Sequence, residues 1–435
     1  MNIHFIGIGG IGISGLAKYM HSLGHRVSGS DISNTVITEG LRKMGIAVTV
    51  PHSAEAIVDQ DLVVHSAIIG ADNPEIVAAK AKGIEVLARR EALLKILGGL
   101  EVYSVAGAHG KSTTTAILAA IMEGSAIIGA ESKAFGSNVR YDASCDRMIF
   151  EADESDGSFI NSNPYCAIVI NAEPEHMEYY DYNYERFYDA YRTFIASAQL
   201  RVINAEDPFL ATLEMEAIRL YPSRDISEIE YVLIDDEPHT RFRLKELGTF
   251  DVWGFGEHIA LDASLAILAA AQSMELETIR TNLLGFKGIK KRFDIINKHR
   301  ESVLIDDYGH HPTEIRATLQ SVKEYARLKG FEKITAIWQP HKYSRTIDNL
   351  EAFINCFEGA AELIILPVWS AGEAERPIDF EEKFERYRPM MADRIKRDAD
   401  SIEILKDEAV LKILDKGLVI GFGAGDITYQ LRGVK

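Results

Sequence analysis

The 435-residue sequence has little cysteine and no long apolar run. Three cysteines, Cys145, Cys166 and Cys356, are too few and too scattered for a disulfide framework or an all-cysteine zinc site, which is typical of a reducing compartment. No run approaches the ~18 apolar residues that a membrane-spanning helix needs. The chain begins with an apolar strand, residues 3–6, rather than a basic leader. We therefore expect a soluble cytoplasmic protein without stable membrane association.

Basic residues are fewer than acidic residues. Lys and Arg number 47 against 65 Asp and Glu, which gives a formal net charge of −18. A field of this sign repels nucleic acid and anionic membrane, so an anionic small molecule must be held by a local cationic pocket. We therefore expect no nucleic-acid partner. The sequence leaves open whether the protein is a monomer or a weak homodimer.

The length exceeds what one hydrophobic core usually serves, and it predicts about three domains. Apolar strands alternate with helical periods in three successive segments, which predicts an α/β protein with mostly parallel sheets. The predicted domains are a Rossmann-like domain at residues 1–98, a central phosphate-loop domain at 99–287 and a second Rossmann-like domain at 288–435. An antiparallel insert is expected at residues 228–256.

The segment VAGAHGKSTT, residues 105–114, is the most informative part of the chain. A short strand runs into a glycine turn, and a Lys–Ser pair then opens a helix. Backbone N–H groups of such a turn close around phosphate oxygens, while Lys111 reaches the terminal phosphates and Ser112 ligates Mg²⁺. The general loop has glycine where Val105 stands, so this loop is a shortened variant. It predicts ATP or GTP binding by Gly107, Ala108, His109, Gly110, Lys111, Ser112 and Thr113.

A second glycine-rich turn, GIGGIG at residues 7–12, follows the first strand, and Asp31 lies nineteen positions beyond Gly12. This spacing predicts a diphosphate near a helix start and a carboxylate near a ribose. Alone, the turn also fits an NAD-linked oxidoreductase, but that interpretation leaves Lys111 and Ser112 without a role. Two phosphate-binding folds in one chain indicate an ATP-driven reaction on a nucleotide-linked substrate.

Six motifs, spread over nearly the whole chain, together resemble the Mur ligase family of peptidoglycan synthesis, and within it the alanine-adding branch. They are GIGGIGISGLA at 7–17, GAHGKSTT at 107–114, EADESD at 151–156, EPEHM at 173–177, DDYGHHPTE at 306–314 and QPHKYSRT at 339–346. The resemblance implies ATP-dependent ligation of L-alanine to the lactyl carboxylate of UDP-N-acetylmuramate through an acyl phosphate. It also implies ATP as the nucleotide and Mg²⁺, or Mn²⁺, as the metal.

The resemblance places the UDP-sugar and the metals in the first two domains. It implies that the UDP diphosphate approaches Gly9, Gly10, Ile11 and Gly12, with Asp31 and Ser66 nearest the uridine. Plain turn residues would look the same at the last two positions. The implied metal ligands are Ser112, Glu151 and His176. Many relatives add a carbamylated lysine after this histidine, but no lysine occurs here between Lys133 and Lys245.

The remaining roles fall mainly in the third domain. The resemblance implies that ATP also meets His258, Arg292 and Asp307, and that the amino acid meets Tyr308, His310, Lys342 and Arg345. Lys111, His176, His310 and Arg345 are the residues it places in catalysis. Two departures weaken parts of this set. Ile259 and Asp262 stand where relatives often have asparagine near the adenine, and Lys342 stands where relatives usually have arginine.

Three alternatives remain at this point. A recycling ligase of the same architecture joins a whole tripeptide to the same UDP-sugar. The NAD-linked oxidoreductase belongs to a different class and would give a nicotinamide-dependent absorbance change. A non-catalytic nucleotide-binding regulator would bind ATP without turnover, although the intact set of metal and cation positions argues against it.

Overall fold

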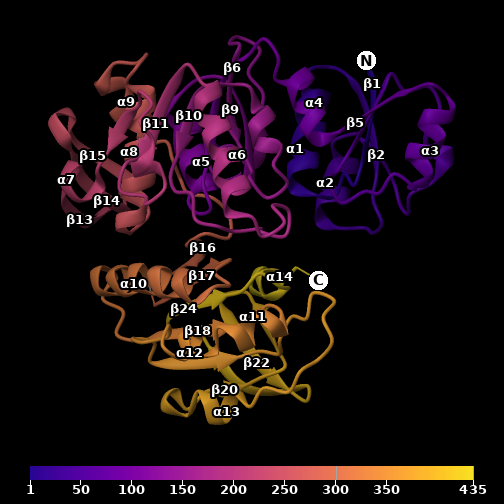
Figure 1. The fold of residues 1–435 in the computed structure, drawn as a ribbon. Helices are drawn as coiled ribbons and strands as arrows, with labels where there is room; N and C mark the ends of the chain where they lie inside the picture. Colours follow the sequence, from indigo (N-terminus) through magenta and orange to yellow (C-terminus); the bar gives the residue numbers. More distant parts are fainter. Residues whose placement is uncertain (300, 435) are drawn as a thin grey trace. The chain divides into compact units, whose positions relative to one another are not determined.

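The computed structural model describes residues 1–299 and 301–434, which form two compact units. The first unit contains residues 1–229, 242–252 and 260–287, and the second contains residues 230–241, 253–259 and the chain from residue 288 onward. Both are α/β structures with mostly parallel sheets (Figure 1). The predicted fold class is therefore confirmed. Within the described residues, no helix combines the length and apolar character needed to cross a bilayer.

The chain begins with a five-stranded parallel sheet in the order β3-β2-β1-β4-β5. Its strands are β1 (Asn2–Ile6), β2 (Arg26–Ser30), β3 (Ala47–Thr49), β4 (Leu62–His65) and β5 (Glu85–Ala88), and its helices are α1 (Ile11–Ser22), α2 (Val36–Lys43), α3 (Pro74–Ala81) and α4 (Arg89–Ile96). The strand order reverses between β1 and β4, and ligands of such sheets bind outside the carboxyl ends of the strands at that point. Gly7, Asp31 and Ser66 follow these ends directly.

A seven-stranded sheet forms the centre of the first unit, in the order β12-β11-β10-β6-β9-β7-β8. The strands are β6 (Glu101–Ala106), β7 (Ser125–Ser132), β8 (Ser137–Arg140), β9 (Arg147–Glu151), β10 (Pro164–Val169), β11 (Leu200–Asn204) and β12 (Ile218–Leu220). All neighbours are parallel except β7 and β8. The helices of this region are α5 (Lys111–Ile121), α6 (Tyr184–Ser197), α7 (Pro222–Asp225), α8 (Glu257–Ala270) and α9 (Leu276–Leu283). Because β6 lies in the middle of this sheet, the phosphate loop that follows it is positioned by strands on both sides.

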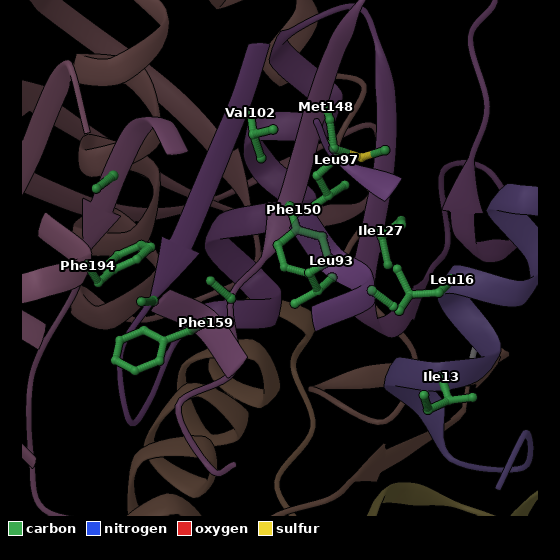
Figure 2. Packing of buried hydrophobic residues seen from close by; sticks show 14 of the residues in the cluster. Ile13, Leu16, Leu93, Leu97, Val102, Ile127, Met148, Phe150, Phe159 and Phe194 are labelled. Carbon is green, nitrogen blue, oxygen red and sulfur yellow. The ribbon is translucent and has the colours of Figure 1, made fainter. Parts of the chain in front are cut away.

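One hydrophobic core joins the two sheets of the first unit. Helices α1 and α4 lie between them, and Figure 2 shows Leu16 of α1 close to Ile127 of β7, with Leu93 of α4 beside Phe150. A side chain at Gly15 would place its Cβ 2.9 Å from Ile127, so glycine permits this close approach. Each fully buried Ile or Leu contributes about 1.5–3 kcal/mol of transfer free energy. The predicted division at residue 98 falls between α4 and β6, and the three-domain division stays a prediction.

The second unit contains a six-stranded sheet in the order β16-β17-β24-β18-β19-β20, antiparallel only between β16 and β17. Its strands are β16 (Asp294–Lys298), β17 (Ser302–Asp307), β18 (Ile334–Trp338), β19 (Glu362–Ile365), β20 (Met390–Met391) and β24 (Gly417–Phe422). Its helices are α10 (Pro312–Lys329), α11 (Tyr343–Asp348), α12 (Leu350–Ile354), α13 (Phe380–Lys383) and α14 (Ile427–Arg432).

Two small three-stranded sheets complete the structure. One, in the order β13-β14-β15, lies where the insert was expected and contributes residues to both units. Its strands are β13 (Ile226–Ile234), β14 (Glu237–Leu244) and β15 (Gly248–Trp253). The other is antiparallel and was not anticipated from the sequence; it consists of β21 (Arg394–Asp398), β22 (Ser401–Lys406) and β23 (Ala409–Leu414).

Helix α14 is tied to the large sheet of the second unit by a buried ionic network. Arg432 donates to Asp306 at 2.8 Å and to Asp294 at 2.5 Å, while Thr428 donates to Asp306 at 2.6 Å. Both carboxylates are buried. Asp306 lies near the end of β17 and Asp294 at the start of β16, so the guanidinium of Arg432 holds these two paired strands together next to Asp307.

Candidate nucleotide and substrate sites

The phosphate loop has the backbone that its glycines require. Gly107 has φ +150° and Gly110 has φ +83°, both in the region that L side chains rarely adopt. A Cβ at Gly110 would lie 2.6 Å from Asp262 Oδ1, so the buried carboxylate of α8 packs directly against the turn. Helix α5 then begins at Lys111, which directs its first N–H groups to the loop.

Asn171 fixes the loop from the neighbouring strand. Its Oδ1 accepts from the backbone N–H of His109 at 3.1 Å, and its Nδ2 donates to the carbonyl of His109 at 3.2 Å. Asn171 follows β10, which pairs with β6 in parallel. The sequence analysis missed this residue, although its place directly after a central strand was a usable signal.

Lys111 is held by the loop and by a buried carboxylate. Its ammonium donates to the carbonyl of Gly107 at 2.6 Å and to Glu154 Oε1 at 3.1 Å. Burial disfavours the charged ammonium, but the carboxylates of Glu154, Asp153 and Glu151 outweigh that effect and raise the pKa of Lys111. Lys111 is therefore charged at neutral pH and is aimed at the inside of the loop.

Ser112 and Glu151 come together as the sequence predicts. Strands β6 and β9 are parallel with Val105 opposite Glu151, so the carboxylate stands beside the start of α5. Ser112 Oγ donates to Glu151 Oε1 at 3.0 Å, and the N–H of Gly129 donates to Oε2 at 2.6 Å. Burial raises the pKa of Glu151, and these donors together with Lys111 oppose that rise. A hydroxyl and a carboxylate are the hard oxygen ligands that Mg²⁺ prefers.

His176 lies with two carboxylates rather than alone. Ligand atoms of His176, Glu154 and Glu175 all lie within 4.8 Å of one another, close enough to share a metal ion. His176 has φ +53°, an uncommon backbone conformation for this residue. Glu175 also lies 3.5 Å from the imidazole of His109 in the phosphate loop. The sequence analysis named His176 as a metal ligand and gave no role to Glu154 or Glu175, although both lie in quoted motifs.

At the first sheet, Asp31 secures the glycine-rich turn. Its Oδ2 accepts from the N–H of Gly9 at 2.8 Å, and its Oδ1 accepts from the N–H of Ile32 at 2.8 Å. Ser66 lies at the turn after β4, where its Cβ is 3.1 Å from a Cβ built on Gly7. The structure therefore brings Asp31 to Gly9 and Ser66 to Gly7 of the glycine-rich turn at residues 7–12, and Asp31 has a structural role there. The predicted approach of the diphosphate to Gly9, Gly10, Ile11 and Gly12 stays a prediction.

In the second unit, Asp307 is buried at the end of β17. Its carboxylate accepts from the N–H groups of Phe293 and Gly309, both at 2.8 Å. Burial raises the pKa of Asp307 to about 6, and the nearby Arg292 and the two N–H donors limit that rise. Arg292 itself lies 3.5 Å from Glu314 and 5.5 Å from the centre of the Tyr308 ring.

His310, His341 and Arg345 form a cluster in the second unit. The ring centres of the two histidines are 6.0 Å apart, and Tyr308 lies 5.2 Å from His310. His310 Nδ1 donates to the carbonyl of Tyr308 at 3.2 Å, because a carbonyl only accepts, so Nε2 carries the free lone pair. Burial lowers the pKa of His310, with Arg345 adding to the effect and Glu314 opposing it.

His341 belongs to a quoted motif, but the sequence analysis gave it no role. Arg345 Nη1 donates to His341 Nδ1 at 3.1 Å, and burial together with that guanidinium lowers the pKa of His341 to about 4. His310 and His341 are therefore both neutral at neutral pH beside the charged Arg345.

Lys342 is the N-cap residue of α11 and has φ +67°, a conformation that is uncommon outside glycine.

His258, the predicted contact for the nucleotide base, is exposed and belongs to the segment 253–259 of the second unit. Ile259 and Asp262 stand where relatives often have asparagine; Ile259 is partly buried, and Asp262 packs against Gly110 within the first unit. The contact of His258 with the base stays a prediction.

A phosphate loop with a facing carboxylate, on an α/β framework, is the arrangement typical of phosphate-loop nucleotide-binding proteins. Family models for the Mur ligase family, catalytic domain, the Mur ligase middle domain and the Mur ligase, glutamate ligase domain match residues 2–99, 105–223 and 291–425, respectively. The chain belongs to the Mur ligase family.

Curated relatives match over nearly their whole length. The UDP-N-acetylmuramate--L-alanine ligase of Campylobacter curvus is 56% identical over 431 residues, 99% of each chain. The enzyme of the same name from Helicobacter pylori strain P12 is 56% identical over 99% of this chain and 96% of its own. Among solved structures, the UDP-N-acetylmuramate-alanine ligase MurC of Thermotoga maritima has a TM-score of 0.82 and 28% identity, covering 99% of this chain and 97% of its own.

Proposed function

We propose that this chain is an ATP-dependent ligase that joins L-alanine to the lactyl carboxylate of UDP-N-acetylmuramate in peptidoglycan synthesis. The observation that carries the proposal is the 56% identity, over 99% of both chains, to an enzyme of that name. The site supports it, because Lys111, Ser112 and Glu151 meet where a phosphate loop needs a cation and hard oxygen ligands.

The chemistry needs ATP because a carboxylate is a poor acylating agent. A lactyl oxygen attacks the terminal phosphorus, the bond from phosphorus to the ADP oxygen breaks, and an acyl phosphate forms. The amine of L-alanine then attacks the acyl carbon, phosphate leaves, and the nitrogen loses a proton. Lys111 stabilises the charge that develops on the transferred phosphoryl group, while Arg292 and Asp307 hold the phosphates and ribose of ATP.

The second unit supplies the amino-acid site in this proposal. Arg345 and Lys342 neutralise the carboxylate of L-alanine, and Tyr308 contributes to the walls of the site. The neutral His310, whose Nε2 carries a free lone pair, accepts the proton that the amine releases. A low pKa keeps this imidazole unprotonated at neutral pH, which is the state that a proton acceptor needs.

The residues present fit a magnesium ion. Ser112 and Glu151 would hold one ion, and His176 with Glu154 and Glu175 would hold a second. Mg²⁺, when bound, neutralises phosphate charge and lowers the barrier to phosphoryl transfer. Because Glu154 also pairs with Lys111, its carboxylate would be shared between the loop and the second ion.

Product mass and phosphate release test the proposal. The purified chain, with ATP, Mg²⁺ and UDP-N-acetylmuramate, receives either L-alanine or the tripeptide L-Ala-γ-D-Glu-meso-diaminopimelate. We expect phosphate release and a product heavier by one alanyl residue with L-alanine alone. An adduct formed only with the tripeptide would identify the recycling activity instead, and ATP binding without any product would identify a regulator.

A further inference from the structure

Arg89 connects the glycine-rich turn of the first sheet with the acidic segment 151–156. It is the first residue of α4, directly after β5, and its side chain is only 11% exposed. Its Nη1 donates to Asp156 Oδ2 at 3.1 Å. Asp156 also accepts from the N–H of Ser158 at 3.0 Å, which fixes the carboxylate. No role was assigned to Arg89 from the sequence.

The guanidinium lies against the start of α1. A Cβ at Gly12 would be 3.2 Å from both Cζ and Nη2 of Arg89, so the lack of a side chain lets the cation approach the first turn of the helix. A cation at this end of a helix is unfavourable, because the helix dipole is positive there. The arrangement becomes favourable when an anion lies at the same place, and the turn at Gly9–Gly12 is the proposed place of the UDP diphosphate.

Arg89 retains donor capacity for such an anion. Its Nε is buried and has no hydrogen-bond partner among the described residues. Guanidinium groups bind phosphate oxygens through paired N–H donors, and such pairs are stronger than neutral hydrogen bonds. Because burial already holds the side chain in place, little conformational entropy remains to be lost on binding.

We propose that Arg89 binds the diphosphate of the nucleotide sugar and that Asp156 positions its guanidinium for this contact. The inference rests on the proposed function, since it needs a UDP-linked substrate at Gly9–Gly12. If Arg89 only formed a structural salt bridge between α4 and the acidic segment, its removal would lower the stability of the fold or would weaken the binding of the whole nucleotide. A diphosphate contact changes only the part of the affinity that the phosphates contribute.

Titration calorimetry of the full chain with UDP, with uridine and with ATP tests this inference. We expect Arg89→Met to weaken UDP binding at least tenfold and to leave uridine and ATP affinities within twofold of the wild type. Arg89→Lys keeps the positive charge but loses the paired N–H donors of the guanidinium, so its UDP affinity should lie between those of Arg89→Met and the wild type. Asp156→Asn, which releases the guanidinium, should weaken UDP binding severalfold. Arg90→Met is the matched control, because Arg90 is the exposed neighbour on the same helix and should not change UDP affinity.

The outcomes separate the two hypotheses. UDP affinity in Arg89→Met equal to the wild type, or an equal loss for uridine and UDP, would overturn the role of Arg89 alone. Absence of UDP binding by the wild-type chain would overturn the proposed function and this inference with it. If Arg89→Met does not fold, the Arg89→Lys variant decides by the same comparison of UDP with uridine.

Discussion

The ammonium of Lys111 makes contacts that a triphosphate would replace, namely the carbonyl of Gly107 and the carboxylate of Glu154. Removing the side chain removes a preorganised charge from the phosphate loop. We expect Lys111→Met to lower the rate of phosphate release at least ~10²-fold. Circular dichroism should show a folded protein, and Lys80→Met, at an exposed helix position, should keep wild-type activity.

Lys111→Met should also lower the stability of the protein, because it leaves the buried carboxylate of Glu154 without its cation. The double variant Lys111→Met with Glu154→Gln removes the leftover charge, so it should recover stability but not activity. A folded Lys111→Met protein with full activity would contradict the proposed mechanism.

Asp307 should give the protein a pH-dependent stability. Its pKa is about 6 in the folded chain against an ordinary 3.8, so the folded state holds the proton more tightly than the unfolded state. The free energy of unfolding therefore falls as the pH rises from about 4 to about 6, by at most about 3 kcal/mol. Asp307→Asn should remove this dependence and be more stable than the wild type at pH 7, while binding ATP more weakly.

Urea denaturation at several pH values, together with ATP titration, measures both effects. The two proteins should have nearly the same stability at pH 4, where the carboxyl is protonated in the folded state. A wild type whose stability advantage grows between pH 4 and pH 7 would contradict the raised pKa.

A substitution of Lys342 should test substrate recognition by strengthening the binding of L-alanine rather than weakening it. A guanidinium binds a carboxylate through two parallel hydrogen bonds, whereas an ammonium acts as a point charge. We expect Lys342→Arg to lower the KM for L-alanine about three- to tenfold and to leave the KM for ATP unchanged. Initial-rate kinetics with varied L-alanine measure this, and a raised KM for L-alanine would show that the lysine is specifically required.

Some of these residue-level contacts follow from the sequence and others do not. The pairing of Ser112 with Glu151 was predictable, because Glu151 ends β9 and Ser112 follows the neighbouring parallel strand β6, so both lie at one sheet edge. Arg89 with Asp156, and Asn171 with His109, depend on how far a side chain reaches between segments that are 67 and 62 residues apart. Strand patterns do not contain that information.

At the scale of elements, α14 stabilises β16 and β17 through Arg432. Removing the guanidinium leaves Asp294 and Asp306 buried without their cation. We expect Arg432→Ala to lower the free energy of unfolding by about 3–5 kcal/mol. The matched control is Arg394→Ala, whose exposed ion pair with Glu408 contributes less than about 1 kcal/mol. Urea unfolding followed by the fluorescence of buried Trp338 measures both, and equal losses would contradict a special role for the network.

The elements also show where sequence patterns are weak. The long apolar strands β17, β18 and β24 were predicted because they are buried on both faces and read as continuous apolar runs. The sheet of β21, β22 and β23 was missed. Its strands mix charged and apolar residues, and Val410, Leu411 and Ile413 of the last strand are exposed, so no clear alternation marks the buried face.

At the scale of the whole molecule, the proposed reaction needs residues from both units. Lys111 and Ser112 belong to the first unit, and Asp307 and Arg345 belong to the second. An acyl phosphate must also be protected from water, so we expect substrate binding to make the protein more compact. Small-angle X-ray scattering should show a smaller radius of gyration with a non-hydrolysable ATP analogue and UDP-N-acetylmuramate together. An unchanged radius would contradict this expectation.

The core shared by the first two sheets has a practical consequence for protein engineering. Because Leu16 and Gly15 of α1 pack directly on Ile127 of β7, the residues that would bind the nucleotide sugar are not a detachable module. A chimera that replaces residues 1–98 with the corresponding part of a distant relative would carry mismatched surfaces into this contact. Exchange of substrate preference within the family should therefore succeed only when the α1 and β7 faces are transplanted together.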